Sequence, residues 1–191
     1  MSGVHIHSGN VGRIAERIVS NELESRGYRV SDLNKEGTSA NADLLAVRDG
    51  KSWQIQVKGS THDRGCWFNY GHCNKENIDK GAPMYNRSDS FYRAQIVALV
   101  CVESASLYTC VLLPVTKAEE LARLNIEREY KPLNKDGTKK KPGPVWSSLK
   151  DIPLRLTNEV RKQSMSQEQD VLQAYRDKWD IDDSTILPVN T

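Results

Sequence analysis

The sequence predicts an α/β domain in which helices flank a mixed central β-sheet. Three observations support this fold class: an amphipathic stretch at residues 10–26, a strand pair around a tight turn at 42–57, and two apolar runs at 95–113. Helices placed before and after a group of strands are typical of a layered domain with one core. A chain of 191 residues is long enough to bury such a core.

The first element is predicted to be a helix at about residues 10–26. Its apolar residues recur three and four positions apart, which places them on one face. They are Val11, Ile14, Ala15, Ile18, Val19 and Leu23. Gly27 stands where such a helix usually ends. Residues 28–30 then predict a short strand, and the polar stretch 35–41 predicts a loop.

The clearest strand pair lies on either side of Asp49 and Gly50. Residues 42–47 are apolar apart from Asp43, and residues 53–57 alternate between apolar and polar side chains. Asp-Gly between two such runs is a strong signal for a two-residue hairpin turn. We therefore expect the two strands to pair as an antiparallel hairpin.

A second hairpin is predicted from residues 95–102 and 107–113, after an irregular stretch in which residues 66–70 favour a strand. Both runs are apolar at odd and even positions alike, as expected for strands covered on both faces. Cys101 and Cys110 would face each other if the turn falls between the two runs. In a reducing compartment both are expected to be small core residues.

The next element is predicted to be a helix that opens at Thr116. Thr116 followed by Glu119 matches a capping box, and the helix should run through about Leu124. Residues 128–145 hold five lysines, three prolines and two glycines, so they predict a linker. Residues 166–179 predict a final helix.

These elements predict a core at residues 1–126, followed by an extension at residues 127–191. The extension would consist of the basic loop and the C-terminal helices, packed on the same domain. The order of helix, strands and helices is what favours this single α/β unit.

Composition limits the kinds of partner that the protein can have. The formal net charge is only +2, so any surface that binds nucleic acid must be local. Lys139, Lys140 and Lys141 are the best candidates for phosphate contacts, although a solvated linker explains them equally well. No run approaches the roughly 18 apolar residues that span a bilayer, so a cytoplasmic protein without a membrane segment is expected.

Asp43, Gln56 and Lys58 form the candidate catalytic cluster. A carboxylate inside an apolar strand is costly unless it has a partner, a metal or an exposed edge. Across the predicted turn, Gln56 and Lys58 project from the same face of the second strand. Oxygen ligands with an ammonium beside them suit Mg²⁺ or Mn²⁺ and phosphodiester hydrolysis, because such ions keep several waters and need few protein ligands.

Glu16 is a candidate for a second carboxylate at this site. It lies at the edge of the apolar stripe of the first helix, and it would reach the metal if that helix packs near the hairpin. Because Gln56 is neutral, the cluster needs another negative charge to balance a divalent cation. A solvated surface position explains Glu16 equally well.

The order of these motifs resembles the PD-(D/E)xK nuclease superfamily. The similarity is greatest to archaeal Holliday-junction resolvases and to restriction endonucleases with a Q-x-K variant. It rests on Gly12-Arg13-Ile14-Ala15-Glu16, Leu23, Gly27-Tyr28-Arg29-Val30, Ala42-Asp43-Leu44-Leu45 and Ile55-Gln56-Val57-Lys58. The resemblance covers roughly residues 8–60. Ala42 departs from it, because many members have proline there.

The resemblance implies a restriction-endonuclease-like core and a metal-dependent endonuclease that cuts DNA. It gives catalytic roles to Glu16, Asp43, Gln56 and Lys58, with Glu16, Asp43 and Gln56 as ligands of Mg²⁺ or Mn²⁺. Cutting a duplex needs two sites, which a homodimer would supply. Two alternatives remain open: a nucleic-acid-binding module of the same fold without catalysis, which Gln56 would favour, and a protein-interaction domain.

Overall fold

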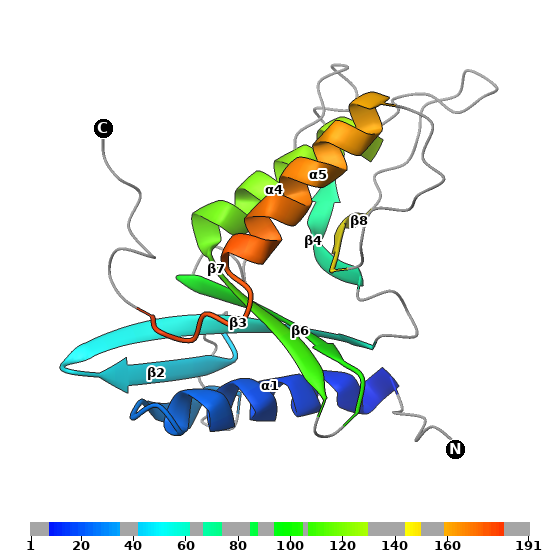
Figure 1. Cartoon of the computed structure of the whole chain (residues 1–191). Helices are drawn as coiled ribbons and strands as arrows, with labels where there is room; N and C mark the ends of the chain where they lie inside the picture. The colour runs from blue at the N-terminus through cyan, green and yellow to red at the C-terminus, as the bar shows by residue number, and fades with distance from the viewer. Residues whose placement is uncertain are drawn as a thin grey trace.

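The structure is a computed structural model that describes residues 8–34, 42–61, 67–73, 85–87, 94–104, 107–129, 144–149 and 159–181. A five-stranded sheet lies between two helical layers. Helix α1 (Ser8–Glu24) lies beneath the sheet in Figure 1, and helices α4 (Val115–Glu129) and α5 (Glu159–Ala174) lie above it. The predicted α/β class with a mixed central sheet is confirmed.

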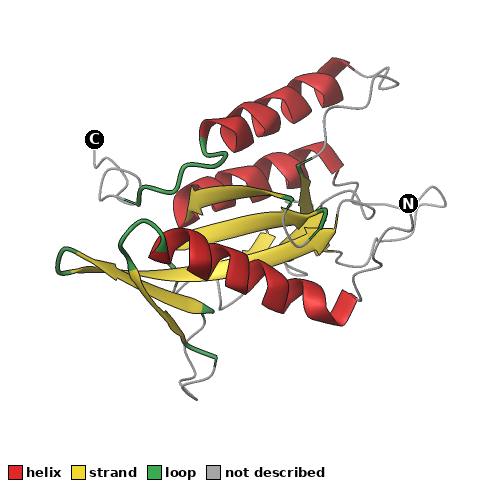
Figure 2. Cartoon of the chain, turned by 60° about the horizontal axis from the view of Figure 1, so that its bottom comes forward, coloured by secondary structure: helices red, strands yellow, loops and turns green. Residues whose placement is uncertain are grey.

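The main sheet has the strand order β1-β2-β3-β6-β7. The strands are β1 (Arg29–Asp32), β2 (Leu44–Arg48), β3 (Lys51–Thr61), β6 (Ile96–Val102) and β7 (Tyr108–Pro114). The central pair β3 and β6 is parallel, and the other neighbours are antiparallel. Figure 2 shows the sheet with helices on both of its sides.

Both predicted hairpins are present. Strands β2 and β3 are joined by Asp49 and Gly50, which have φ angles of 53° and 77°. Positive φ at both residues is the requirement of the type I′ turn, which glycine meets without strain. Strands β6 and β7 form the second hairpin, and all seven residues of β6 are buried.

Helix α1 covers one face of the sheet with its apolar stripe. Ala15, Val19 and Leu23 are fully buried against Ile55 of β3 and its neighbours. Gly27, with a φ of 83°, ends the helical segment as predicted. The face that this helix covers therefore belongs to the larger of the two main apolar clusters.

Helices α4 and α5 cover the opposite face. Leu121 of α4 and Leu172 of α5 pack with Val97 and Leu99 of β6. The buried side chains of Arg128 and Glu168 form an ion pair, each only 4% exposed. Since an unpaired charge is costly in such a place, the pair ties the end of α4 to α5.

A second sheet of three strands, in the order β5-β4-β8, was only partly predicted from the sequence. Strand β4 (Trp67–Cys73) corresponds to the predicted strand at 66–70. Strands β5 (Tyr85–Arg87) and β8 (Pro144–Ser148) fall in stretches that were expected to be irregular. In Figure 1 strands β4 and β8 stand beside α4, beyond the end of β3.

The last described segment, residues 175–181, corrects the predicted final helix. Helix α5 begins at Glu159 instead of residue 166 and ends at Ala174 instead of residue 179. Beyond it, Asp177 adopts a positive φ of 52° and its N–H donates to the carbonyl of Cys110. Trp179 and Ile181 are then buried in the α1-side cluster, so both belong to the core outside any helix.

The register of β6 and β7 also corrects the expected cysteine pair. Cys101 lies opposite Thr109, and Cys110 lies opposite Val100. The two sulfur atoms consequently project to opposite faces of the sheet. Cys110 is free and buried as expected, whereas Cys101 is disulfide-bonded, so the expectation of two reduced core residues is correct for Cys110 only.

Candidate active site

Asp43 lies directly before β2, at the open end of the β2–β3 hairpin. The register pairs Leu44 with Ile55, so Asp43 stands opposite Gln56 on the neighbouring strand. Paired residues of an antiparallel ladder project to the same face. Ile55 and Val57 face α1, which leaves Asp43, Gln56 and Lys58 on the side of α4.

The carboxylate of Asp43 accepts hydrogen bonds on both of its oxygens. Oδ2 accepts from the backbone N–H of Val57 at 2.7 Å and from the Nε2 of Gln56. Oδ1 accepts from the Nδ2 of Asn34 at 3.2 Å. Three N–H donors thus compensate a negative charge at the end of an apolar strand, which explains why the sequence tolerates it there.

Gln56 is buried, with 6% of its surface exposed. Its Nε2 faces Asp43 and also lies 3.4 Å from the carbonyl oxygen of Val57. Because a carboxylate can only accept, the amide has to present its nitrogen in this arrangement. Reversing the amide would present its oxygen to the same place.

Lys58 is partly buried on the same face, opposite Leu99 of β6. Burial lowers the pKa of Lys58 below its ordinary value, and the negative charge of Asp43 partly offsets this effect. The ammonium therefore holds its proton less firmly than an exposed lysine does. A lysine of this kind near a carboxylate is common at functional sites.

Glu16 lies elsewhere, in a cavity between α1 and the β1–β2 edge. This cavity is also lined by Arg13, Arg17, Ser20, Glu24, Val30, Asp32 and Leu44. The structure therefore brings Asp43, Gln56 and Lys58 together and places Glu16 on the α1 side. Leu44, which follows Asp43 in the chain, lines the cavity that contains Glu16. Glu24 and Asp32, the other two carboxylates that line this cavity, were not singled out from the sequence.

Asn34 is the residue of the cluster that sequence reasoning missed. It follows β1 and precedes the polar stretch 35–41, and no spacing rule relates it to Asp43. An asparagine two residues after Asp32 favours a turn. That signal predicts local structure, and the contact with Asp43 depends on how β1 pairs with β2.

The donor set was compared with the needs of a divalent cation. Among the described residues, no three histidine, cysteine, aspartate or glutamate side chains gather so that they could hold a metal ion. Asp43 offers one carboxylate, and the amides of Gln56 and Asn34 present their nitrogens to it. With the Gln56 amide reversed, its oxygen and the carboxylate would suit Mg²⁺ or Mn²⁺, which bind through one or two carboxylates together with waters and substrate phosphates.

Lys139, Lys140 and Lys141 lie outside the described residues, so their predicted contact with nucleic acid stays a prediction. They shortly precede Pro144, the first residue of β8. None of the described helices is long and apolar enough to cross a membrane.

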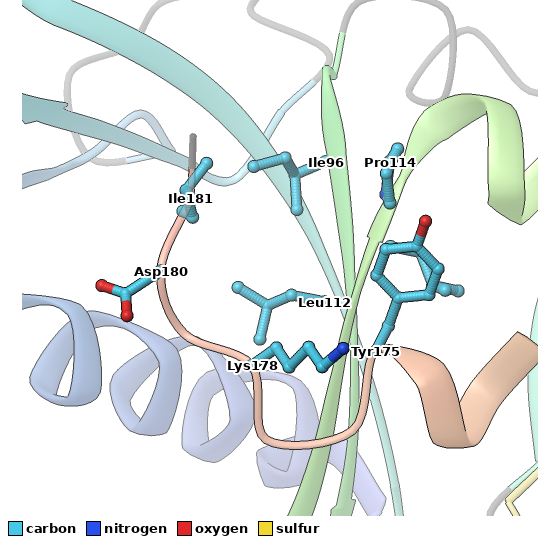
Figure 3. Close-up of a pocket in the computed structure, with 8 residues that line it drawn as sticks. Ile96, Leu112, Pro114, Tyr175, Lys178, Asp180 and Ile181 are labelled. Carbon is cyan, nitrogen blue, oxygen red and sulfur yellow. The ribbon is translucent and has the colours of Figure 1, made fainter. Parts of the chain in front are cut away.

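A small apolar pocket lies where residues 175–181 cross the end of β7 (Figure 3). Ile96, Leu112 and Ile181 line its inner part. In the figure Lys178 extends toward Tyr175, while Asp180 points away from it. Tyr175, Lys178 and Asp180 are the polar side chains of its lining, and none of the lining residues belongs to the Asp43 cluster.

The fold and the cluster define an α/β domain with a carboxylate, an amide and an ammonium at the end of one hairpin. No family model matches the chain, and no curated protein matches it. Among solved structures, the bacterial homing endonuclease I-Ssp6803I is similar, with a TM-score of 0.44 and 12% sequence identity. The match covers 88% of this chain and 95% of that chain. Similarity at this level does not establish a function, which has to be argued from the site.

Proposed function

We propose that the protein is a metal-dependent endonuclease that hydrolyses phosphodiester bonds in DNA at the Asp43 cluster. One observation carries the proposal: Asp43 lies opposite Gln56, bonds to its side chain, and acts electrostatically on the partly buried Lys58. Phosphodiester hydrolysis requires a group that accepts or orients a proton and positive charge near the phosphate oxygens. The cluster offers both within one hairpin.

Each side chain of the cluster has a role that follows from its chemistry. Asp43 and, with its amide reversed, Gln56 would hold Mg²⁺ or Mn²⁺. Glu16, which the sequence resemblance suggests as a further ligand, lies in the separate cavity beside α1. The ion, when bound, supplies Lewis acidity and a more acidic water. Lys58 orients the attacking water or stabilises the charge that develops on the phosphoryl oxygens. Because burial lowers its pKa, Lys58 exchanges a proton more easily than an exposed lysine.

The proposed substrate is DNA, on the basis of the motif resemblance, with Lys139, Lys140 and Lys141 as phosphate contacts. Cutting both strands of a duplex needs two sites, which a homodimer would supply. Phosphate contacts of this kind make the affinity for DNA fall steeply with salt concentration.

The test is cleavage of supercoiled, linear, branched and single-stranded DNA with Mg²⁺ or Mn²⁺. We expect the wild-type chain to cut at least one of these substrates only with metal. Asp43→Asn and Lys58→Met should each lower the rate at least a hundredfold, because each removes a group from the reacting centre.

Matched controls separate chemistry from folding. Asp170→Ala and Lys178→Met alter exposed residues away from the cluster and should leave the rate within about twofold. Thermal melts show whether each variant is folded. Cleavage that continues without metal, or that survives both cluster variants, would refute the proposal.

One observation favours a second candidate, a DNA-binding module of the same fold without catalysis. Both oxygens of Asp43 are satisfied by neutral N–H donors, so the carboxylate can be explained by hydrogen bonding alone. Such a module would bind DNA with salt-dependent affinity. It would show no heat of Mn²⁺ binding that depends on Asp43, and it would cut none of the four substrates.

A further inference from the structure

A covalent bond leaves the main sheet at Cys101, in strand β6. Cys101 is disulfide-bonded, whereas Cys110 is free. The chain has four cysteines, so the partner of Cys101 is Cys66 or Cys73. Cys73 is the last residue of β4, and Cys66 directly precedes that strand. With either partner, the disulfide therefore links the main sheet to one end of β4 in the second sheet.

The disulfide starts on the face of the main sheet that carries Lys58. In the register of β3 and β6, Lys58 lies opposite Leu99 and Ser60 lies opposite Cys101. Leu99 and Cys101 pack in the apolar cluster under α4. Residues two apart on a strand are separated by about 7 Å. The link to β4 is therefore anchored one side chain further along this face than the neighbour of Lys58.

No backbone ladder joins the two sheets in the part of the chain that the structure describes. Strands β4, β5 and β8 pair only with one another. Both β4 and β8 contact α4, and β4 also contacts β3. Figure 1 shows β4 and β8 beside α4, beyond the end of β3. The disulfide of Cys101 therefore adds a covalent fastening where strand pairing supplies none.

We propose that the thiol–disulfide state of Cys101 controls whether the second sheet is fixed beside Lys58. The reductant is a dithiol, which gives two electrons and two protons to the bridge. The S–S bond breaks, two cysteine thiols form, and the dithiol becomes a disulfide. This inference goes beyond the proposed function and does not depend on it, because it concerns the attachment of β4, β5 and β8 alone.

The first test maps the disulfide in the full chain, purified without reductant and alkylated before digestion. Mass spectrometry should find Cys101 bonded to Cys66 or Cys73, with Cys110 alkylated as a free thiol. Cys101 alkylated as a free thiol, or bonded to Cys110 or to a second molecule, would overturn the inference.

The second test compares the chain with and without dithiothreitol. Since Cys101 is only 3% exposed, complete reduction is first verified by counting thiols. Reduction should lower the melting temperature by about 5–15 °C, as expected for one disulfide in a chain of this size. Amide hydrogen exchange in β4 and β8 should become at least about tenfold faster, while β2 keeps its protection.

Cys101→Ala and Cys110→Ala are matched variants, because each removes one buried sulfur from a different face of the sheet. Cys101→Ala should exchange like the reduced wild type and should not respond to dithiothreitol, whereas Cys110→Ala should respond as the wild type does. If reduction changes neither melting nor exchange, or if Cys101→Ala responds like the wild type, the inference fails. None of these measurements involves metal or cleavage, so failure of the proposed function would leave the inference intact.

Discussion

At the scale of single residues, Asp43 shows how a side chain can continue a β-ladder in place of the backbone. Its carbonyl accepts from Leu33 of the neighbouring β1 side, so the N–H of Val57 bonds to the carboxylate Oδ2 instead. The ladder therefore ends on a charged atom. An otherwise apolar strand can hold a carboxylate at its start because the backbone of the next strand compensates the charge.

The meeting of Asp43 and Gln56 could be predicted from the sequence, whereas that of Asp43 and Asn34 could not. The two-residue turn at Asp49 and Gly50 fixes the register of the hairpin, and that register sets Asp43 opposite Gln56. Asn34 reaches Asp43 through a separate strand whose pairing is not determined by any turn of two residues. The position of Glu16 relative to Asp43 depends on how α1 packs on the sheet, which short sequence motifs do not specify.

Lys58→Met should raise the melting temperature at pH 7 while it removes activity. Burial lowers the folded-state pKa of Lys58 below the unfolded value of about 10.4, so below the folded pKa its buried charge opposes folding. This cost disappears as pH rises toward the unfolded pKa, and methionine avoids it at every pH. The difference in melting temperature between Lys58→Met and the wild type should therefore become smaller above about pH 10.

Thermal melts between pH 6 and 11 test this expectation. Lys178→Met, at an exposed lysine, is the control and should shift the melting temperature by a similar small amount at every pH. If the Lys58→Met protein melts below the wild type at pH 7, burial of the charged Lys58 ammonium does not destabilise the fold, and the prediction is wrong.

At the scale of elements, Gly59 decides how closely α1 approaches β3. A Cβ atom at Gly59 would lie 2.9 Å from the Cβ of Ala15 and 2.9 Å from the carbonyl oxygen of Val11. Both neighbours belong to the first half of α1, and one of them is backbone. The helix would have to move for any larger residue to fit.

Gly59→Ala should therefore cost about 1–3 kcal/mol of unfolding free energy, the usual range for overpacking. Gly12→Ala is the matched control, because nothing lies within 4 Å of a Cβ at that exposed helical position. It should stabilise the protein by about 0.5–1 kcal/mol through helix propensity. Chemical denaturation of both variants measures the two effects, and equal stabilities would show that α1 is not packed against Gly59.

The main sheet could be predicted from the sequence because its strands are apolar and joined by short turns. The second sheet could not, because β8 is short, follows a lysine-rich stretch and pairs with β4 from a distant part of the chain. Pairing between distant segments leaves no periodic signal in either of them. The early start of α5 was missed because its first half, from Glu159, is mostly polar.

At the scale of the whole molecule, residues 175–181 join the C-terminal part of the chain to its beginning. The hydroxyl of Tyr28 donates to the carbonyl of Ile181 at 3.1 Å and accepts from its N–H at 2.9 Å. Arg48 lies over the Tyr28 ring at 4.1 Å, and Arg26 lies over Trp179 at 5.4 Å. The predicted helix to residue 179 was wrong because Trp179 keeps helical spacing from Leu172 while the chain turns at Asp177.

Tyr28→Phe should lower the unfolding free energy by about 1–3 kcal/mol, because it leaves the buried N–H and C=O of Ile181 unpaired. Tyr175→Phe, at a half-buried tyrosine in the same segment, is the control and should cost less than about 1 kcal/mol. Denaturant titration compares them. Equal losses of unfolding free energy would mean that the two hydrogen bonds between the Tyr28 hydroxyl and the Ile181 backbone contribute nothing to stability.

The two-residue turn at Asp49 and Gly50 also bears on the order in which the molecule assembles. Closing a short hairpin costs little chain entropy and takes microseconds, whereas pairing β4 with β8 closes a much longer loop and costs more chain entropy. We therefore expect Asp43 and Gln56 to become neighbours before the second sheet forms.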